Sequence, residues 1–265
     1  MERFAEWVAA QQQRIGILIT PWGEALTHGY YRRLMSALSH VPHVYRISVQ
    51  TNLSSPLDDL FAAHRDTLAL WTTFHPSQVS LERFVSRCRE LDQAHIRYSV
   101  GVVGLREHFD KIEALRATLL PGIYLWINAY KQQANYYDSS EIKRLLAVDP
   151  YFHWNRQTYT SRGKPCSAGE TSFTVDGAGN VRRCHFLDPI IGNIYETSFP
   201  ACLKPRTCTA ATCGCHIGYI HRPELNLDEL YGEGFLERIP ALWPEVVPAF
   251  AQSSFVLSSV TRDYV

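Results

Sequence analysis

The sequence predicts an α/β protein with a parallel sheet, followed by a small cysteine-rich unit. Apolar strands alternate with helical segments over residues 1–148, and short loops join them, a pattern typical of βα units. The predicted strands are nearly continuous apolar runs, as expected for strands that are covered on both faces. Six of the seven cysteines lie between residues 166 and 218. The alternation predicts either a barrel or a doubly wound sheet and leaves that choice open.

Five strands and six helices are predicted in the first part of the chain. The first helix, over residues 1–13, places Phe4, Trp7 and Val8 on one side. We expect strands at residues 14–20, 44–54, 68–74, 96–104 and 123–130, and further helices at residues 27–41, 56–67, 80–95, 108–119 and 138–149. Thr27 and Ser80 have the side chains of helix N-caps. Because a βα series should start on a strand, the chain looks as if it opens partway through its first unit.

The chain divides into three parts on these patterns. Residues 1–150 form the α/β part, residues 151–220 the cysteine-rich domain and residues 221–265 a C-terminal tail. Residues 151–165 lose the helical period and are predicted to be a linker into the second part. One short helix with turns is expected after Tyr219, and the remainder of the tail carries no chemical signal.

Composition narrows the class of protein. Lys plus Arg and Asp plus Glu number 26 each, so the net charge indicates neither a nucleic-acid partner nor an anionic membrane. No apolar run is long enough to span a bilayer, and the N-terminus does not have the pattern of a signal peptide. We therefore expect a cytoplasmic protein with reduced thiols, in which clustered cysteines indicate a metal rather than disulfides. Cys88, alone on a predicted helix, is expected to be a packing residue.

The cysteine cluster predicts a thiolate metal site. A β-hairpin is expected over residues 171–184, because Asp-Gly and a second Gly supply a tight turn. The spacings are wide, C-x17-C, then C-x23-C, then C-x4-C-x-C, and they favour an iron–sulfur cluster while zinc stays possible. Four ligands are needed, and the candidates are Cys166, Cys184, Cys208 and one of Cys213 or Cys215. Cys202 has no assigned role, and His185 and His216 are not expected to be ligands.

Polar residues and glycines follow the predicted strands, where α/β proteins place their sites. Glu24 offers a carboxylate for an ammonium group, and Gly23 lets backbone carbonyls approach. Both residues also fit a plain turn and the first turn of a helix, and Asn52 fits an Asx-turn. The other positions are weaker candidates: Trp22, Gln50, Thr51, Thr72, Thr73, Gly101, Gly104 and Asn128.

Taken together, these segments resemble radical SAM enzymes with a C-terminal SPASM or twitch extension. PWGEAL is similar to the GGEP motif that holds the methionyl amine of S-adenosylmethionine, with Trp22 and Ala25 replacing Gly and Pro around Gly23 and Glu24. QTNLS resembles the Thr-Asn-Gly end of the next strand, and SVGVVGLRE the segment that packs on the adenine, with Val103 and Gly104 in the matching places. The most specific match is to the opening of the extension. It consists of a cysteine, a hairpin, a second cysteine and then IGNIYE.

The resemblance implies a partial (β/α) TIM-type barrel that lacks its first strand, followed by a small cysteine-rich hairpin domain. Its implied cofactors are S-adenosylmethionine, bound by Trp22, Gly23, Glu24, Asn52, Val103 and Gly104, and an auxiliary [4Fe–4S] cluster on Cys166, Cys184, Cys208 and Cys213 or Cys215. The family's CxxxCxxC loop, which binds the catalytic cluster, does not occur in these residues. We expect the chain to be truncated relative to that family, so that a second [4Fe–4S] cluster requires an upstream segment.

The implied activity is generation of a 5′-deoxyadenosyl radical that modifies a small-molecule or peptide substrate. A reductant such as flavodoxin or ferredoxin would supply the electron. Residues 1–265 alone are expected to lack this activity, because the catalytic cluster has no thiolate ligands in them. The alternative is a non-catalytic α/β protein that binds an iron–sulfur cluster or zinc.

Overall fold

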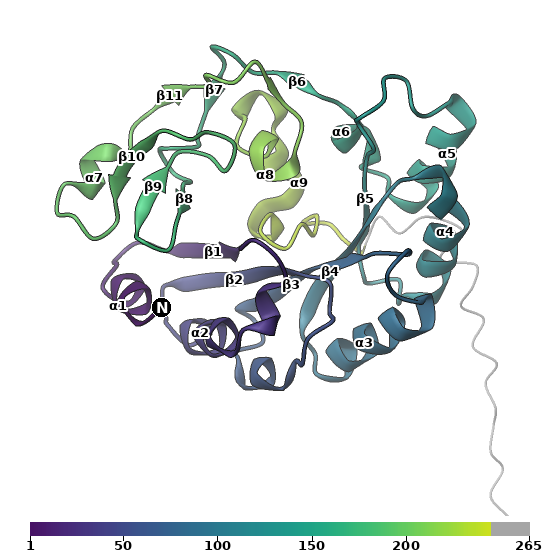
Figure 1. The fold of residues 1–265 in the computed structure, drawn as a ribbon, viewed down its shortest axis with the longest axis horizontal. Coiled ribbons are helices and arrows are strands. Elements are labelled where there is room, and N and C mark those ends of the chain that lie inside the picture. Colours follow the sequence, from purple (N-terminus) through teal and green to yellow (C-terminus); the bar gives the residue numbers. More distant parts are fainter. Residues whose placement is uncertain (245–265) are drawn as a thin grey trace, which may run out of the picture.

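The structure, a computed structural model, describes residues 1–244 and has a five-stranded parallel sheet at its centre (Figure 1). The strands pair in chain order, β1-β2-β3-β4-β5. They are β1 (Ile15–Ile19), β2 (Val44–Thr51), β3 (Leu68–Phe74), β4 (Arg97–Val103) and β5 (Leu125–Asn128). All five predicted strands and the α/β class are confirmed. In the described part of the chain β1 and β5 lie at opposite edges, so the sheet is open and forms no closed barrel.

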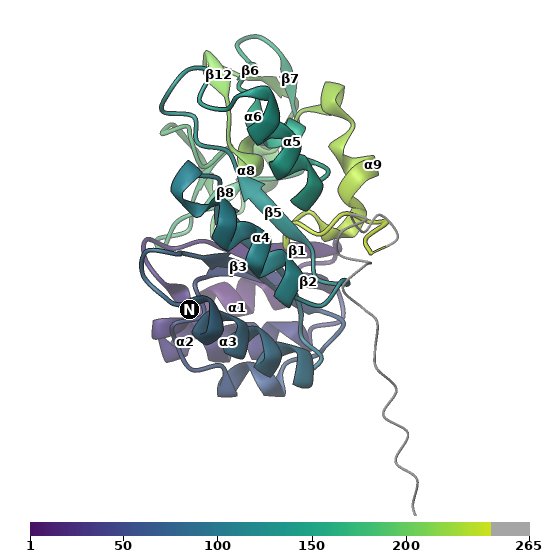
Figure 2. The same ribbon diagram turned by 90° about the vertical axis from the view of Figure 1, so that its right-hand side faces the viewer.

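Helices cover one face of this sheet (Figures 1 and 2). They are α1 (Glu2–Ala9), α2 (Gly29–Ser39), α3 (Leu81–Gln93), α4 (Phe109–Thr118) and α5 (Ser139–Val148). The main core lies between the helices and the sheet, and it includes Cys88 of α3 as a buried packing residue. Ser80 caps α3 as predicted, by accepting from the backbone N–H of Arg83. Thr27 does not cap α2, because its hydroxyl donates to the Glu24 carbonyl at 2.8 Å.

Two local predictions are corrected. The helix expected at residues 56–67 is a 3-10 helix, Asp58–Ala62. Leu57, Leu60 and Ala63 are buried three residues apart, which matches the three residues per turn of a 3-10 helix. The expected linker at residues 151–165 begins with α6 (Phe152–Arg156), which is too short to give a periodic signal. Phe152 is buried in the core, and Asn155 accepts the Ala129 N–H at 2.6 Å.

The cysteine-rich part lies on the opposite side of the sheet from α1 to α3 (Figures 1 and 2). Its short strands are β6 (Tyr159–Thr160), β7 (Pro165–Cys166), β8 (Thr174–Val175), β9 (Asn180–Arg182), β10 (Ile190–Asn193), β11 (Arg206–Thr207) and β12 (Thr212–Cys213). The predicted hairpin is confirmed as the antiparallel pair β8 and β9. The short helices here are α7 (Phe199–Cys202), α8 (His216–Tyr219) and α9 (Leu227–Tyr231).

The chain then returns to the face of the sheet that the helices leave bare. Ile239 and Trp243 pack with Trp71, Tyr124 and Trp126 in a second apolar cluster. Glu237 is fully buried and pairs with two arginines of the sheet, with its Oε1 at 2.9 Å from Arg97 Nε and 3.3 Å from Arg46 Nε. Residues 232–244 therefore pack on this face. The one short helix predicted after Tyr219 is α9, and the sequence carried no signal from residue 241 onward. The prediction for the tail beyond them lies outside the described residues.

Candidate metal centre

Antiparallel pairing brings three of the candidate cysteines together. Cys166 lies in β7, which pairs with β11, and Cys208 follows β11 directly. Cys213 ends β12, where it pairs with Tyr159 of β6. Cys184 follows β9, the second strand of the hairpin. The four cysteines therefore come from three stretches of the chain, at residues 166, 184 and 208–213.

Backbone and arginine hydrogen bonds hold the cysteine loops in position. The Cys208 N–H donates to the Lys164 carbonyl at 2.8 Å, and the Gly163 N–H donates to the Cys208 carbonyl at 2.8 Å. Arg183 is buried and donates from Nε to the Ala168 carbonyl at 3.2 Å and from Nη1 to the Thr207 carbonyl. The guanidinium thus ties the end of the hairpin to both neighbouring loops.

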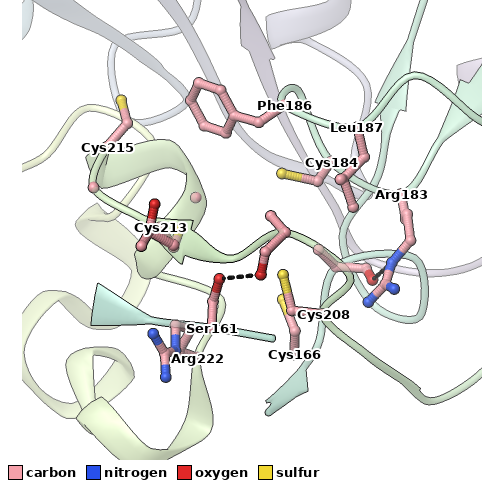
Figure 3. Close-up of a pocket in the computed structure, with 15 residues that line it drawn as sticks. Ser161, Cys166, Arg183, Cys184, Phe186, Leu187, Cys208, Cys213, Cys215 and Arg222 are labelled. Carbon is pink, nitrogen blue, oxygen red and sulfur yellow. Dashed lines mark hydrogen bonds between the residues drawn. The ribbon is translucent and has the colours of Figure 1, made fainter. Parts of the chain in front are cut away.

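These segments enclose a cavity of about 240 Å³. Figure 3 shows the thiols of Cys166, Cys184 and Cys208 directed into the same space. The lining also includes two arginines and several apolar groups, and its members are Ser161, Cys166, Ala168, Arg183, Cys184, Phe186, Leu187, Cys208, Ala210, Thr212, Cys213, Gly214, Cys215, Gly218 and Arg222. A space lined by several thiols, with cations beside them, is chemically suited to a soft metal group.

The thiols are close enough to affect one another's ionisation. Burial raises the pKa of Cys213 to about 12, and the thiols of Cys184 and Cys208 add to the rise. Burial also raises the pKa of Cys184, with further contributions from Cys166 and Cys208. Cys184 and Cys213 therefore ionise less readily than free thiols unless a compensating positive charge lies nearby. A bound metal group supplies that charge.

Cys213 and Cys215 occupy different surroundings. The Cys213 sulfur fits against Gly218, where an added Cβ would lie 2.8 Å from Sγ. Cys215 is exposed and begins α8, and Figure 3 shows its thiol pointing away from the other sulfurs. The structure therefore groups Cys213 with Cys166, Cys184 and Cys208.

The remaining cysteines and histidines lie outside this group. Cys202 packs on Gly192 of β10, where an added Cβ would lie 2.5 Å from Sγ, and it does not line the cavity. His185 is exposed, and His216 is buried among Trp71, Tyr219 and Tyr231. Within residues 1–244, no three His, Cys, Asp or Glu side chains converge closely enough to hold one metal ion.

The strand-end residues are brought together around Glu24. Its Oε1 accepts from the Leu26 N–H at 3.0 Å and the Thr51 hydroxyl at 2.7 Å, and its Oε2 accepts from the Asn52 N–H at 2.7 Å. Glu24 thus caps a 3-10 helix and ties the end of β1 to the end of β2. Asn52 forms the Asx-turn, since its Oδ1 accepts from Ser54 N at 2.9 Å. Gly23 has a φ of +85°, which explains the glycine.

The other predicted strand-end residues make fewer contacts with one another. Trp22 is fully exposed. Val103 is half-buried at the end of β4. The Gly104 N–H donates to the Asn128 carbonyl at 2.9 Å, and its carbonyl accepts from the Tyr137 hydroxyl at 2.7 Å. Gly104 therefore lies where the chain after β4 passes close to the end of β5.

Sequence reasoning missed the cations of this region. Arg183 and Arg222 line the cavity, and Lys131, just after β5, donates to the Gly214 carbonyl. Burial lowers the pKa of Lys131 to about 8, against the influence of Cys215. Lys131 is 83 residues away in the sequence from Gly214, to which it donates, so no local pattern indicates it. Arg222 follows Cys213 closely in the sequence, but the sequence does not show that its side chain is buried beside the cavity. Arg183 directly precedes Cys184, and that adjacency was the one available signal.

Comparisons with protein-family models, curated proteins and solved structures give no match to this chain. In the described part of the chain, no helix combines the length and apolar character needed to cross a membrane.

Proposed function

We propose that this protein binds a [4Fe–4S] cluster through Cys166, Cys184, Cys208 and Cys213. The observation that carries the proposal is that these four residues all line one cavity of about 240 Å³. Thiolates are the usual ligands of such clusters. The spacing of the cysteines supports Cys166, Cys184 and Cys208 with either Cys213 or Cys215. The interaction of the Cys213 thiol with the other three favours Cys213 as the fourth.

The surroundings of the cavity suit a group with net negative charge. Four thiolates outweigh the positive charge of the iron–sulfide core, so the bound cluster carries an excess of negative charge. Arg183 and Arg222 supply positive charge at the cavity wall, and each lowers the pKa of a neighbouring cysteine against the effect of burial. Apolar residues such as Phe186 and Leu187 limit water on another side.

Anaerobic reconstitution with iron and sulfide tests the proposal. We expect about four iron and four sulfide per chain, with broad absorption near ~400 nm, as for other clusters held by four thiolates. Cys166→Ala should remove most of this absorbance, whereas Cys202→Ser should retain it, because Cys202 does not line the cavity. Stoichiometric zinc without sulfide would instead support a zinc protein and refute the cluster.

We further propose that the chain is of the radical SAM type. Each strand of the sheet pairs with the next strand in the chain, in the order β1-β2-β3-β4-β5, and helices cover one face. Consecutive units of a (β/α) barrel have this arrangement, whereas in a doubly wound sheet the strand order reverses and helices cover both faces. This supports a partial TIM-type barrel as the fold. The resemblance of PWGEAL and of the hairpin segment to that family supports the assignment.

Glu24 has capacity for a cofactor ammonium group. An ionised carboxylate has about four acceptor sites, and the three hydrogen bonds at Glu24 leave one of them. The remaining contacts with the cofactor would come from Gly23, Asn52, Val103 and Gly104. The N–H and the carbonyl of Gly104 are already hydrogen-bonded, so this residue would contribute by leaving space where another residue has a side chain. When bound beside a reduced catalytic cluster, S-adenosylmethionine supplies a 5′-deoxyadenosyl radical.

Binding and cleavage of S-adenosylmethionine can be tested separately. Isothermal titration should detect binding that Glu24→Gln weakens at least tenfold, because the variant lacks the charge that attracts the ammonium group. The 265-residue chain should form no 5′-deoxyadenosine with dithionite, since it contains no CxxxCxxC. Robust cleavage by this chain would show that the reaction does not need a CxxxCxxC loop. No binding at all would favour the non-catalytic alternative.

A further inference from the structure

Phe186 lies where the cysteine cavity reaches the surface. Among the residues that line the cavity, Phe186, Thr212 and Cys215 are exposed. Thr212 and Cys215 lie on one stretch, from β12 to the start of α8, whereas Phe186 lies two residues after Cys184, beyond the end of the hairpin. The cavity therefore opens between these two stretches of the chain.

The Phe186 ring extends across this opening to α8. A Cβ added at Gly218 of α8 would lie 3.1 Å from Phe186 Cε2 and 2.8 Å from Cys213 Sγ. Because both distances start from the same point, the edge of the ring lies within about 6 Å of the Cys213 sulfur. In Figure 3 the ring extends from the Cys184 side of the cavity toward Cys215. One aromatic side chain thus joins the two stretches that border the opening.

The position of this ring is an equilibrium, because the side chain is only partly buried. Phe186 is 48% exposed, and its neighbour His185 is exposed as well. The buried half of an aromatic side chain favours the position in which the ring keeps its contacts. Exposed side chains nevertheless change rotamer on a picosecond to nanosecond timescale. The fraction of molecules in which the ring has moved aside therefore sets how fast a solute enters.

We propose that Phe186 gates the cysteine cavity: its ring covers the opening, and small molecules reach the thiols when the ring moves aside. The gate follows from the shape of the cavity and holds for whichever metal the thiols bind. Its role in the entry of iron and sulfide and in the protection of the bound group rests on the proposed [4Fe–4S] site. Control of solvent access by an apolar cover is one of the means by which a protein tunes a metal group.

Thiol labelling of the reduced, metal-free protein tests the gate without any cluster. A bulky maleimide is the probe, and mass spectrometry with fragmentation gives the labelling rate of Cys213 relative to that of Cys202, which does not line the cavity. Phe186→Ala removes the ring, and Phe186→Leu keeps an apolar cover. Phe61→Ala is the matched control, because Phe61 is 37% exposed and lies in the 3-10 helix Asp58–Ala62, outside the cavity lining.

Phe186→Ala should raise the relative labelling rate of Cys213 about tenfold, because a half-buried ring leaves its contacts in only about a tenth of the molecules. Phe186→Leu should restore most of the protection, and Phe61→Ala should match the wild type. A rise of less than twofold in Phe186→Ala overturns the gate, as does an equal rise in Phe61→Ala or in Phe186→Leu. Faster labelling of Cys202 in Phe186→Ala also overturns it, since the whole cysteine-rich part would then have loosened.

The reconstituted protein extends the test to the bound group. At iron and sulfide contents equal to those of the wild type, Phe186→Ala should lose iron to a chelator about tenfold faster, for the same reason, and Phe186→Leu nearly at the wild-type rate. Equal rates for Phe186→Ala and the wild type overturn the role of the ring in protecting the cluster. If the wild type takes up no iron and sulfide, the cluster proposal fails, and the thiol labelling still decides whether Phe186 gates the cavity.

Discussion

Glu237→Gln should destabilise the protein strongly, because Glu237 joins residues 232–244 to the sheet. Its side chain is 0% exposed, and its Oε1 lies 2.9 Å from Arg97 Nε and 3.3 Å from Arg46 Nε. Its backbone carbonyl also accepts from the Ser99 hydroxyl at 2.6 Å. Removing one partner of a buried ion pair costs about 3–5 kcal/mol.

The expected loss lies at the lower end of that range. The Arg97 side chain is 44% exposed and can be rehydrated, whereas Arg46 is 11% exposed and keeps an uncompensated charge. We therefore expect a loss of about 3 kcal/mol in the free energy of unfolding. Urea unfolding followed by tryptophan fluorescence measures it, since Trp71, Trp126 and Trp243 lie in the same cluster.

Glu233→Gln is the matched control for this experiment. Glu233 lies four residues earlier and pairs with Arg14, and the two side chains are 56% and 62% exposed. An exposed pair contributes about 0.5 kcal/mol or less in most cases. If Glu237→Gln costs no more than Glu233→Gln, the described contact between the C-terminal segment and the sheet is wrong.

Three further predictions concern the cysteine site, pH and the core. Gly218→Ala would place a Cβ 2.8 Å from Cys213 Sγ, so the reconstituted variant should lose iron to a chelator severalfold faster than the wild type. The control Gly122→Ala has no atom within 4 Å of the new Cβ and should lose iron at the wild-type rate. Equal rates for the two variants would contradict the placement of Cys213. Burial lowers the pKa of His221 to about 4, below the ordinary value of about 6.5. The stability that this neutral histidine contributes is present above about pH 6.5 and is lost as the pH falls toward 4, by about 2 kcal/mol at pH 5. Urea unfolding at pH 7 and 5 should show this loss, and an unchanged difference in His221→Gln would contradict it. Burial raises the pKa of Cys88 to about 12, so iodoacetamide at about pH 8 should alkylate Cys88 only after the protein unfolds, as measured by mass spectrometry. If Cys88 of the native protein were labelled as fast as Cys215, Cys88 would not be buried.

The strands and most helices could be predicted because their signals are local. Strands β2 to β5 are mostly buried on both faces, and Ser80 marks the start of α3 through its own side chain. The 3-10 helix at Asp58–Ala62 was predicted as an α-helix, because Leu57, Leu60 and Ala63 also satisfy the spacing of an α-helical face. Elements of two to five residues, such as β6 and α6, are too short to show a period.

The packing of residues 232–244 could not be predicted, because it depends on distant partners. Glu237 and Arg238 give this stretch a polar appearance in the sequence. Their burial follows from Arg97, which is 140 residues away in the chain, and from the indole of Trp126, whose ring centre lies 4.1 Å from the Arg238 guanidinium. No local pattern carries that information.

The sequence led to a proposed set of ligands but left open the choice between Cys213 and Cys215. Their difference depends on where β12 ends: Cys213 is the last residue of the strand, and Cys215 begins α8. Both residues line the cavity, but Cys213 is half-buried and Cys215 is exposed, so two residues of backbone place the two thiols in different surroundings. The sequence alone does not show where β12 ends.

Iron and sulfide analysis of Cys213→Ser and Cys215→Ser, after anaerobic reconstitution, tests the central claim most directly. The two substitutions are identical and lie two residues apart, so each controls for the other. The structure predicts that Cys215→Ser retains about four iron and four sulfide per chain, because its thiol points away from the other sulfurs, and that Cys213→Ser loses most of both. Equal retention by the two variants, or loss only from Cys215→Ser, would contradict the proposed metal centre.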